Sequence, residues 1–459
     1  MTFRNLNRTA VLRWCLEGRR TLALALPIMS GLVGQMLMGL TDTLMVGQVG
    51  TIPLAAAAFG HNLINVPLVG GMGLLAAVAV LAAQAYGAQQ PAEAGQVLRH
   101  GLFISVLGGL GAAVFLSYFR SRVGWLNQPP EVVAAAQTYL LLTAWSLLPV
   151  MVGHALKQFS EALVHPWPPT LIMLGGVLLN IFLNWLLIFG HWGFPAMGLN
   201  GAGLATLLAR IATTIVMVGF VLRAPSLARY LPARWFAWPS WPAIRAQLTL
   251  GTPVAAQHLL EVGAFVAAAL MMGWINAEAM AAHQIAITCA ATTFIFALGI
   301  GMAVSIRVGH AWGARARRRL RLVGFSGLAM SGVLMSGFAL LFIFGGNAIA
   351  HAFSRSPEVV GMAAAMLFIA GFFQIFDGFQ VVAMSALRGM SDVRLPAVVA
   401  IISYWLVALP LAGLLGFVLD LGARGIWIGL AAGLATAAVI LCWRFQRLTG
   451  FRSSADTAR

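Results

Sequence analysis

Three carboxylates, Asp42, Glu261 and Asp377, lie inside long apolar runs of this 459-residue chain. A charged side chain at the centre of a bilayer costs about 3 kcal/mol on insertion scales, so it is rarely present without a function. A carboxylate is tolerated there when it is protonated or paired with a cation. Each acid is therefore a candidate proton or sodium site, and the three together indicate ion-coupling chemistry.

The apolar runs predict the elements that must position these acids. The chain is 60% hydrophobic and only 9% charged, whereas a soluble domain carries about 25% charged residues. Eleven hydropathy breaks separate twelve apolar segments, most of 20 residues or more, and each is long enough to span about 30 Å of hydrocarbon. The segments are too long and too apolar for barrel strands. We expect an all-α polytopic membrane protein with twelve transmembrane helices.

The net charge of +16 is unevenly distributed along the chain. With the N-terminus in the cytoplasm and strict alternation of the segments, 23 of the 28 basic residues fall on the cytoplasmic side. This positive-inside bias predicts that both termini are cytoplasmic. The arginine run of residues 315–321 is interpreted as a topology signal facing anionic lipid. A nucleic-acid partner is therefore not expected.

The two halves of the chain resemble each other. Leu26-Pro27-Ile28 matches Thr252-Pro253-Val254, and Ala85-Tyr86-Gly87-Ala88 matches Ala311-Trp312-Gly313-Ala314, both at an offset of 226; the offset later becomes 224. Six helices per half would insert both halves in the same sense, as parallel repeats about the membrane normal, with a cavity and rocking between the two lobes. We expect an N-terminal lobe (1–222), a cytoplasmic linker (223–246), a C-terminal lobe (247–445) and a cytoplasmic tail (446–459).

Glu261 and Asp377 are predicted to share one pocket in the second lobe. A helix starting near Gln247 places Glu261 about 21 Å from the cytoplasmic end, and a helix ending near Leu387 places Asp377 about 15 Å from it. Two carboxylates in one pocket can hold a proton between them or chelate sodium through oxygen ligands. The alternative is that each acid is only an interhelical hydrogen-bond partner.

Asp42 stands apart in the first lobe. Asn180 and Asn184 are one turn apart on a single helix face, and together with Thr206 and Gln35 they are candidates for an oxygen-lined site around Asp42. Ordinary interhelical hydrogen bonding remains equally open for these residues. Arg210 is the one base clearly inside an apolar run, and it could pair with an acid or extend to the interface.

Soft and aromatic side chains near the acids are candidates for a cavity that accepts lipophilic cations, although plain packing also explains them; these residues are Met38, Met271, Phe265, Phe294 and Phe376. The sequence contains no nucleotide-binding loop, metal motif or nucleophile triad. We therefore expect neither enzymatic activity nor a cofactor other than the coupling ion.

The chain resembles the multidrug and toxic compound extrusion (MATE) family, in its NorM-like branch. The resemblance spans essentially the whole chain and is carried by Pro27 and four motifs, which are Gly39-Leu-Thr-Asp-Thr-Leu-Met-Val-Gly47, Gly251-Thr-Pro-Val-Ala-Ala with Glu261, Gln374-Ile-Phe-Asp-Gly-Phe-Gln380 leading to Ala386-Leu-Arg-Gly389, and Gly198-Leu-Asn-Gly-Ala-Gly-Leu-Ala-Thr206.

The resemblance implies a secondary antiporter in the bacterial inner membrane that expels cationic amphipathic drugs in exchange for Na⁺ or H⁺. It implies ion-coupling roles for Asp42, Glu261 and Asp377, with sodium as a possible occupant of the Glu261–Asp377 pair. The related DinF-like branch tends to carry an aspartate where this chain has Asn184. Some sodium-linked relatives carry a tyrosine where this chain has Phe373, which leaves the coupling ion open. We expect a monomer.

Two other functions compete with drug efflux. A lipid-linked saccharide flippase of the same broad superfamily is the alternative, but it needs a cationic cavity for pyrophosphate, whereas the charges at mid-membrane depth are acidic. A channel or receptor would show no saturable, gradient-driven flux.

Overall fold

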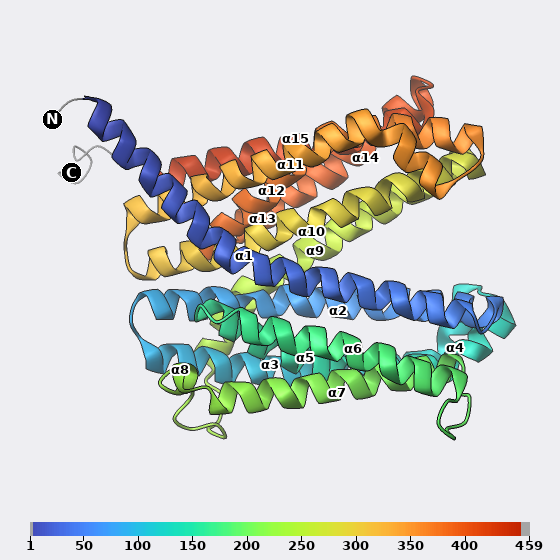
Figure 1. Cartoon of the computed structure of the whole chain (residues 1–459), viewed down its shortest axis with the longest axis horizontal. Helices are drawn as coiled ribbons and strands as arrows, with labels where there is room; N and C mark the ends of the chain where they lie inside the picture. Colours follow the sequence, from blue (N-terminus) through green and yellow to red (C-terminus); the bar gives the residue numbers. More distant parts are fainter. Residues whose placement is uncertain (1–2, 451–459) are drawn as a thin grey trace. The chain divides into compact units, whose positions relative to one another are not determined.

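The computed structural model describes residues 3–450, with the backbone alone described for residues 3–13, and it is helical throughout its regular elements (Figure 1). Twelve helical spans are long and apolar enough to cross a membrane in this described part of the chain, which confirms the predicted fold class. Their elements are α1 (Phe3–Gly47), α2 (Thr51–Gly87), α3 (Pro91–Phe119) with η1 (Arg120–Leu126), α4 (Pro130–Trp145) with α5 (Leu147–Ala162), α6 (Trp167–Phe189), α7 (Leu199–Arg223), α9 (Trp241–Ile275), α10 (Ala277–Gly313), α11 (Arg317–Phe353), α12 (Pro357–Gly389), the run α13 (Arg394–Ala400), η2 (Ile401–Ala408), α14 (Leu409–Gly413) and η3 (Leu414–Val418), and α15 (Gly422–Thr449).

The segment between the halves contains only the short helix α8 (Pro225–Ala228) before α9 begins at Trp241 rather than near Gln247. Prolines interrupt this segment because each removes a backbone donor. The end of the predicted tail, residues 451–459, lies outside the described residues.

The helices group into two compact units. One contains Met1–Met29 with Gln257–Arg459, and the other contains Ser30–Ala256. The predicted lobes keep every helix whole, but by contact α1 and α9 are each divided between units, shortly after Pro27 and Pro253 respectively. These prolines are equivalent in the repeat, and a proline inside a helix removes one hydrogen bond and permits a bend.

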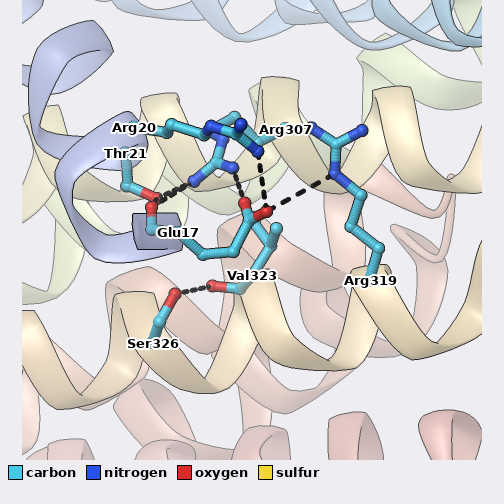
Figure 2. Close-up of polar contacts among 7 residues, drawn as sticks. All are labelled: Glu17, Arg20, Thr21, Arg307, Arg319, Val323 and Ser326. Carbon is cyan, nitrogen blue, oxygen red and sulfur yellow. Dashed lines mark hydrogen bonds and ion pairs between the residues drawn. The ribbon is translucent and has the colours of Figure 1, made fainter. Parts of the chain in front are cut away.

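The first segment of α1 is fixed to α10 and α11 within its unit. The Arg307 guanidinium donates to the Glu17 carboxylate, to the Glu17 carbonyl oxygen and to the Thr21 hydroxyl. Figure 2 shows this carboxylate facing Arg307, with Arg20 and Arg319 on either side. In the other unit, Gln247 of α9, the repeat equivalent of Thr21, donates to the Val97 carbonyl oxygen at 2.8 Å.

A stripe of glycines on α15 positions the eleventh span. Gly425, Gly429 and Gly433 recur every four residues, and a Cβ atom on each would collide with the backbone or Cβ atoms of residues 403–416. Small residues at this spacing let two membrane helices approach closely. The close approach holds η2, a π-helical segment, against α15.

Candidate functional site: two acid-centred polar clusters

The first cluster joins three elements of one unit around Glu261. The Tyr404 hydroxyl of η2 donates to Glu261 Oε1 of α9 at 2.9 Å. Gln380 Nε2 of α12 donates to the Tyr404 oxygen at 2.6 Å. Tyr404 and Gln380 are buried, so the chain Gln380–Tyr404–Glu261 is a polar path inside an apolar bundle.

Asp377 lies one turn before Gln380 on the same face of α12 and is 4% exposed. It lies within electrostatic range of both Glu261 and Tyr404. Glu261 and Asp377 therefore lie in the same unit and interact electrostatically, and a pocket shared by the two acids stays a prediction. Arg388, farther along α12, is also within electrostatic range of Glu261.

Local backbone geometry explains how Tyr404 reaches this cluster. Residues 401–408 form a π-helical segment, whose wider turn changes the side-chain register relative to an α-helix. Such segments are frequent at functional sites. Phe373, one turn before Asp377, has no hydroxyl group. The hydroxyl group that donates to Glu261 belongs to Tyr404.

Aromatic rings form one wall of the cluster. The Phe265 ring, one turn beyond Glu261 on α9, lies 6.2 Å from the Phe373 ring and 6.3 Å from the Tyr404 ring. Phe376 and Met271 belong to the same apolar core.

The five predicted cavity residues do not all fall in one unit. Phe265, Met271, Phe294 and Phe376 lie in the unit that contains Glu261, and Met271 is 8% exposed within its core. Met38 lies on the part of α1 that belongs to the other unit.

The second cluster surrounds Asp42, where α1, α6 and α7 meet. Asn184 Nδ2 donates to Asp42 Oδ1 at 2.5 Å and to Asn180 Oδ1 at 3.2 Å. Asn180 Nδ2 donates to Thr206 Oγ1 at 3.5 Å. The structure thus places three of the four residues considered for this site in one hydrogen-bonded chain with Asp42. Gln35 lies two turns before Asp42 on α1 and is half-buried.

Arg210 lies near this cluster on α7. Its Nη1 atom donates to the Ser146 hydroxyl at 2.7 Å, at the break between α4 and α5. It is within electrostatic range of Asp42. Within the described part of the chain, ion pairs involve the acids Glu17, Glu161 and Asp392 and none of the three acids of the two clusters.

Several buried carbonyl oxygens accept no hydrogen bond from any described group; they include Asn184 Oδ1, Gln374 Oε1 and Gln380 Oε1. A buried acceptor without a donor costs about 1–3 kcal/mol. Gln374 and Gln380 flank Asp377 on α12, and Asn184 touches Asp42. Asp377 and Asp42 therefore each have neighbouring amide oxygens of a type that can ligate a hard cation.

Sequence reasoning missed Tyr404 and Gln380 as site residues. A signal for Gln380 was present, because it follows Asp377 by three residues and so shares its helix face. Tyr404 is a lone phenol in the apolar run Ile-Ile-Ser-Tyr-Trp-Leu-Val, and its direction depends on a π-helical register that the sequence pattern does not reveal.

The family model for MatE matches residues 27–186 and again residues 253–414. The chain belongs to the MatE family. The two matches start at the equivalent prolines Pro27 and Pro253, which confirms the internal repeat.

Two curated relatives that are similar to this MatE chain carry the same description. The chain is 37% identical over 432 residues to a "Probable multidrug resistance protein NorM" of Bradyrhizobium diazoefficiens, and the match covers 93% of each chain. It is also 37% identical to a protein of the same description from Rhodopseudomonas palustris, covering 95% of this chain and 93% of the relative.

Solved transporter structures share the fold of this chain at low sequence identity. A point mutant of the Vibrio cholerae MATE transporter VcmN superposes with a TM-score of 0.88 at 19% identity, covering 95% of this chain and 98% of the other. A superfamily transporter from Pyrococcus furiosus superposes with a TM-score of 0.86 at 20% identity over 94% and 96% of the two chains, and its description states that the reverse polarity of its binding pocket suggests a different function. The fold alone therefore does not identify the substrate. The charges of the side chains at the site are needed to choose between substrate classes.

Proposed function

We propose that this membrane protein is a secondary active antiporter that exports cationic amphipathic drugs in exchange for Na⁺ or H⁺ by alternating access. The observation that carries the proposal is the Glu261–Asp377 pair, two acids within electrostatic range of each other inside an apolar unit. Two close carboxylates that are not held in ion pairs can take up and release a cation.

The surroundings of the acids support a site for a small cation. Gln374 Oε1 and Gln380 Oε1 are buried carbonyl oxygens without donors beside Asp377. Sodium binds such oxygens directly, while a protonated carboxyl group could donate to one of them. We therefore propose Na⁺ or H⁺ as the coupling ion.

The wall of the cluster supports a lipophilic, cationic substrate. Phe265 and Phe373 contribute aromatic rings near Glu261 and Asp377, aromatic rings attract cations, and the acids have the complementary charge. Relatives described as multidrug resistance proteins support drugs as the substrate class. Cation binding and drug binding would favour different conformations, and this linkage would couple the two fluxes.

The positive-inside bias supports an inner-membrane orientation with both termini in the cytoplasm, and we propose that the protein acts as a monomer. The alternative, a lipid-linked saccharide flippase, would require basic groups to hold pyrophosphate. The two polar clusters are centred on acids, which favours a cationic substrate.

The experiment is ethidium transport into proteoliposomes containing the full-length protein under an imposed sodium or proton gradient. Gradient-driven transport should be lost in Glu261→Gln and in Asp377→Asn. Glu358→Gln, an exposed acid on the same helix as Asp377, is the matched control and should transport as the wild type does. If both cluster variants keep full gradient-driven transport, the proposed coupling role is wrong.

A further inference from the structure

The linker between α7 and α9, beside the label α8 in Figure 1, is basic and rich in aromatic residues. Residues 223–246 contain four arginines, five aromatic residues and no acid, and the next acidic residue along the chain is Glu261. The ion pairs in the described part of the chain involve none of these four arginines. The linker therefore has a positive charge that its own sequence does not balance, and the proposed transport cycle does not use it.

Three of the aromatic side chains in this linker are largely exposed. Phe236 is 102% exposed, Trp238 is 92% exposed, and Trp241, the first residue of α9, is 67% exposed. Their neighbours Trp235 and Ala237 are half-buried. Exposed apolar groups rimmed by polar residues mark sites of contact with other proteins or with membranes. The side chains of Phe236, Trp238 and Trp241 form the aromatic edge of the linker.

A buried histidine of α3 holds the end of the linker. His100 is fully buried, and its Nδ1 atom lies 2.7 Å from the Gln96 carbonyl oxygen. Because a carbonyl oxygen only accepts, the imidazole proton is on Nδ1, and Nε2 accepts from the Ser240 backbone N–H at 3.0 Å. This hydrogen bond fixes the chain to α3 between Trp238 and Trp241.

The start of the aromatic segment is fixed to the same helix. The Arg99 Nη1 atom donates to the Arg234 carbonyl oxygen at 3.4 Å. A Cβ atom at Gly95 would lie 3.0 Å from the Leu231 carbonyl group, so the backbones of α3 and the linker approach closely there. Both ends of residues 234–240 are therefore attached to α3, which leaves the aromatic edge on the outer side of the linker.

We propose that the linker docks onto an anionic lipid surface, with the aromatic edge in the interfacial region and the arginines against the headgroups. The linker joins two spans long and apolar enough to cross a membrane, so it starts and ends near the membrane interface, where tryptophan is enriched. The orientation proposed above places it on the cytoplasmic side, where the anionic leaflet attracts basic groups. Arg234 and Arg245, both exposed, flank the aromatic edge. The docking rests on that orientation and not on the coupling chemistry of the acids.

The test follows a nitrobenzoxadiazole label on Phe236→Cys of the full-length protein in nanodiscs, with the native thiols removed as Cys15→Ser, Cys289→Ala and Cys442→Ala. Dithionite reduces this label only in water, so the rate follows the undocked fraction. Reduction should be slower in phosphatidylcholine–phosphatidylglycerol nanodiscs than in phosphatidylcholine nanodiscs. In the anionic nanodiscs, Arg234→Gln/Arg245→Gln should speed reduction by about 30-fold, since each arginine near anionic lipid contributes about one tenfold factor or slightly less. Trp238→Ser/Trp241→Ser should speed reduction in both lipids, because it removes two apolar anchors.

The matched control is Arg120→Gln/Arg122→Gln, which removes two arginines just beyond the far end of α3. Because α3 contacts the linker near its start, this variant should be reduced at the wild-type rate. Equal reduction rates in the two lipids would overturn the proposal, and so would wild-type rates in both the arginine and the tryptophan variants. Slow reduction that depends on neither the lipid nor these side chains would show that the aromatic edge packs against the protein itself.

Discussion

Replacing Glu17 by Ala should open the first segment of α1. Arg307 is 7% exposed and Glu17 is 8% exposed, and the Arg307 guanidinium donates to the carboxylate, to the Glu17 carbonyl oxygen at 2.6 Å and to Thr21. Removing one partner of a buried ion pair costs about 3–5 kcal/mol because the other charge stays buried. Arg307 would keep its two neutral acceptors, so we expect the lower end, about 3 kcal/mol, which is about a 100-fold change in an equilibrium constant.

The assay is hydrogen exchange of the purified protein, read by mass spectrometry over residues 14–29. Amides that exchange by local opening should exchange about 100-fold faster in Glu17→Ala, while those of α6 should not change. Arg20→Ala is the matched control. Its salt bridge to Glu17 spans 3.1 Å but its side chain is 61% exposed, so about 0–1 kcal/mol should be lost. The double variant Glu17→Leu/Arg307→Met should restore slow exchange, because no unpaired charge remains. Unchanged exchange in Glu17→Ala, or an equal effect of Arg20→Ala, would refute this reasoning.

Three further changes test other contacts. Tyr404→Phe removes the hydroxyl that donates to Glu261 and that accepts from buried Gln380. Ethidium efflux under a limiting ion gradient should fall roughly tenfold, as expected for a lost hydrogen bond to a charged group. Efflux at the wild-type rate would exclude Tyr404 from the site. Asn184→Leu leaves Asp42 and Asn180 without their common donor and should lower the stability of the purified protein by about 1–3 kcal/mol, and an unchanged thermal melt would contradict the Asp42 cluster. Gly433→Leu would press on Ala408 and the Ser403 carbonyl and should cost about 1–3 kcal/mol, whereas Gly337→Leu, which faces open space, should melt as the wild type does.

Features that depend on local pattern could be predicted from the sequence. The twelve spans follow from apolar runs of membrane-spanning length, and the shared helix face of Asn180 and Asn184 follows from their spacing of one turn. Features that depend on distant packing could not. The break at Ser146 lies inside a continuous apolar run. The π-helical segment that carries Tyr404 and the division of α1 and α9 between units arise from contacts between remote residues, which periodicity does not encode.

In an antiporter, a gradient of the drug must drive a flux of the coupling ion, and this flux can be measured directly. In proteoliposomes with no initial ion gradient, an imposed ethidium gradient should drive sodium or protons in the opposite direction, and this ion flux should be absent in Glu261→Gln/Asp377→Asn. Varying sodium and pH independently would identify the coupling ion. An ethidium flux that moves neither ion, or an ion flux that persists in the double variant, would contradict the role assigned to the Glu261–Asp377 pair.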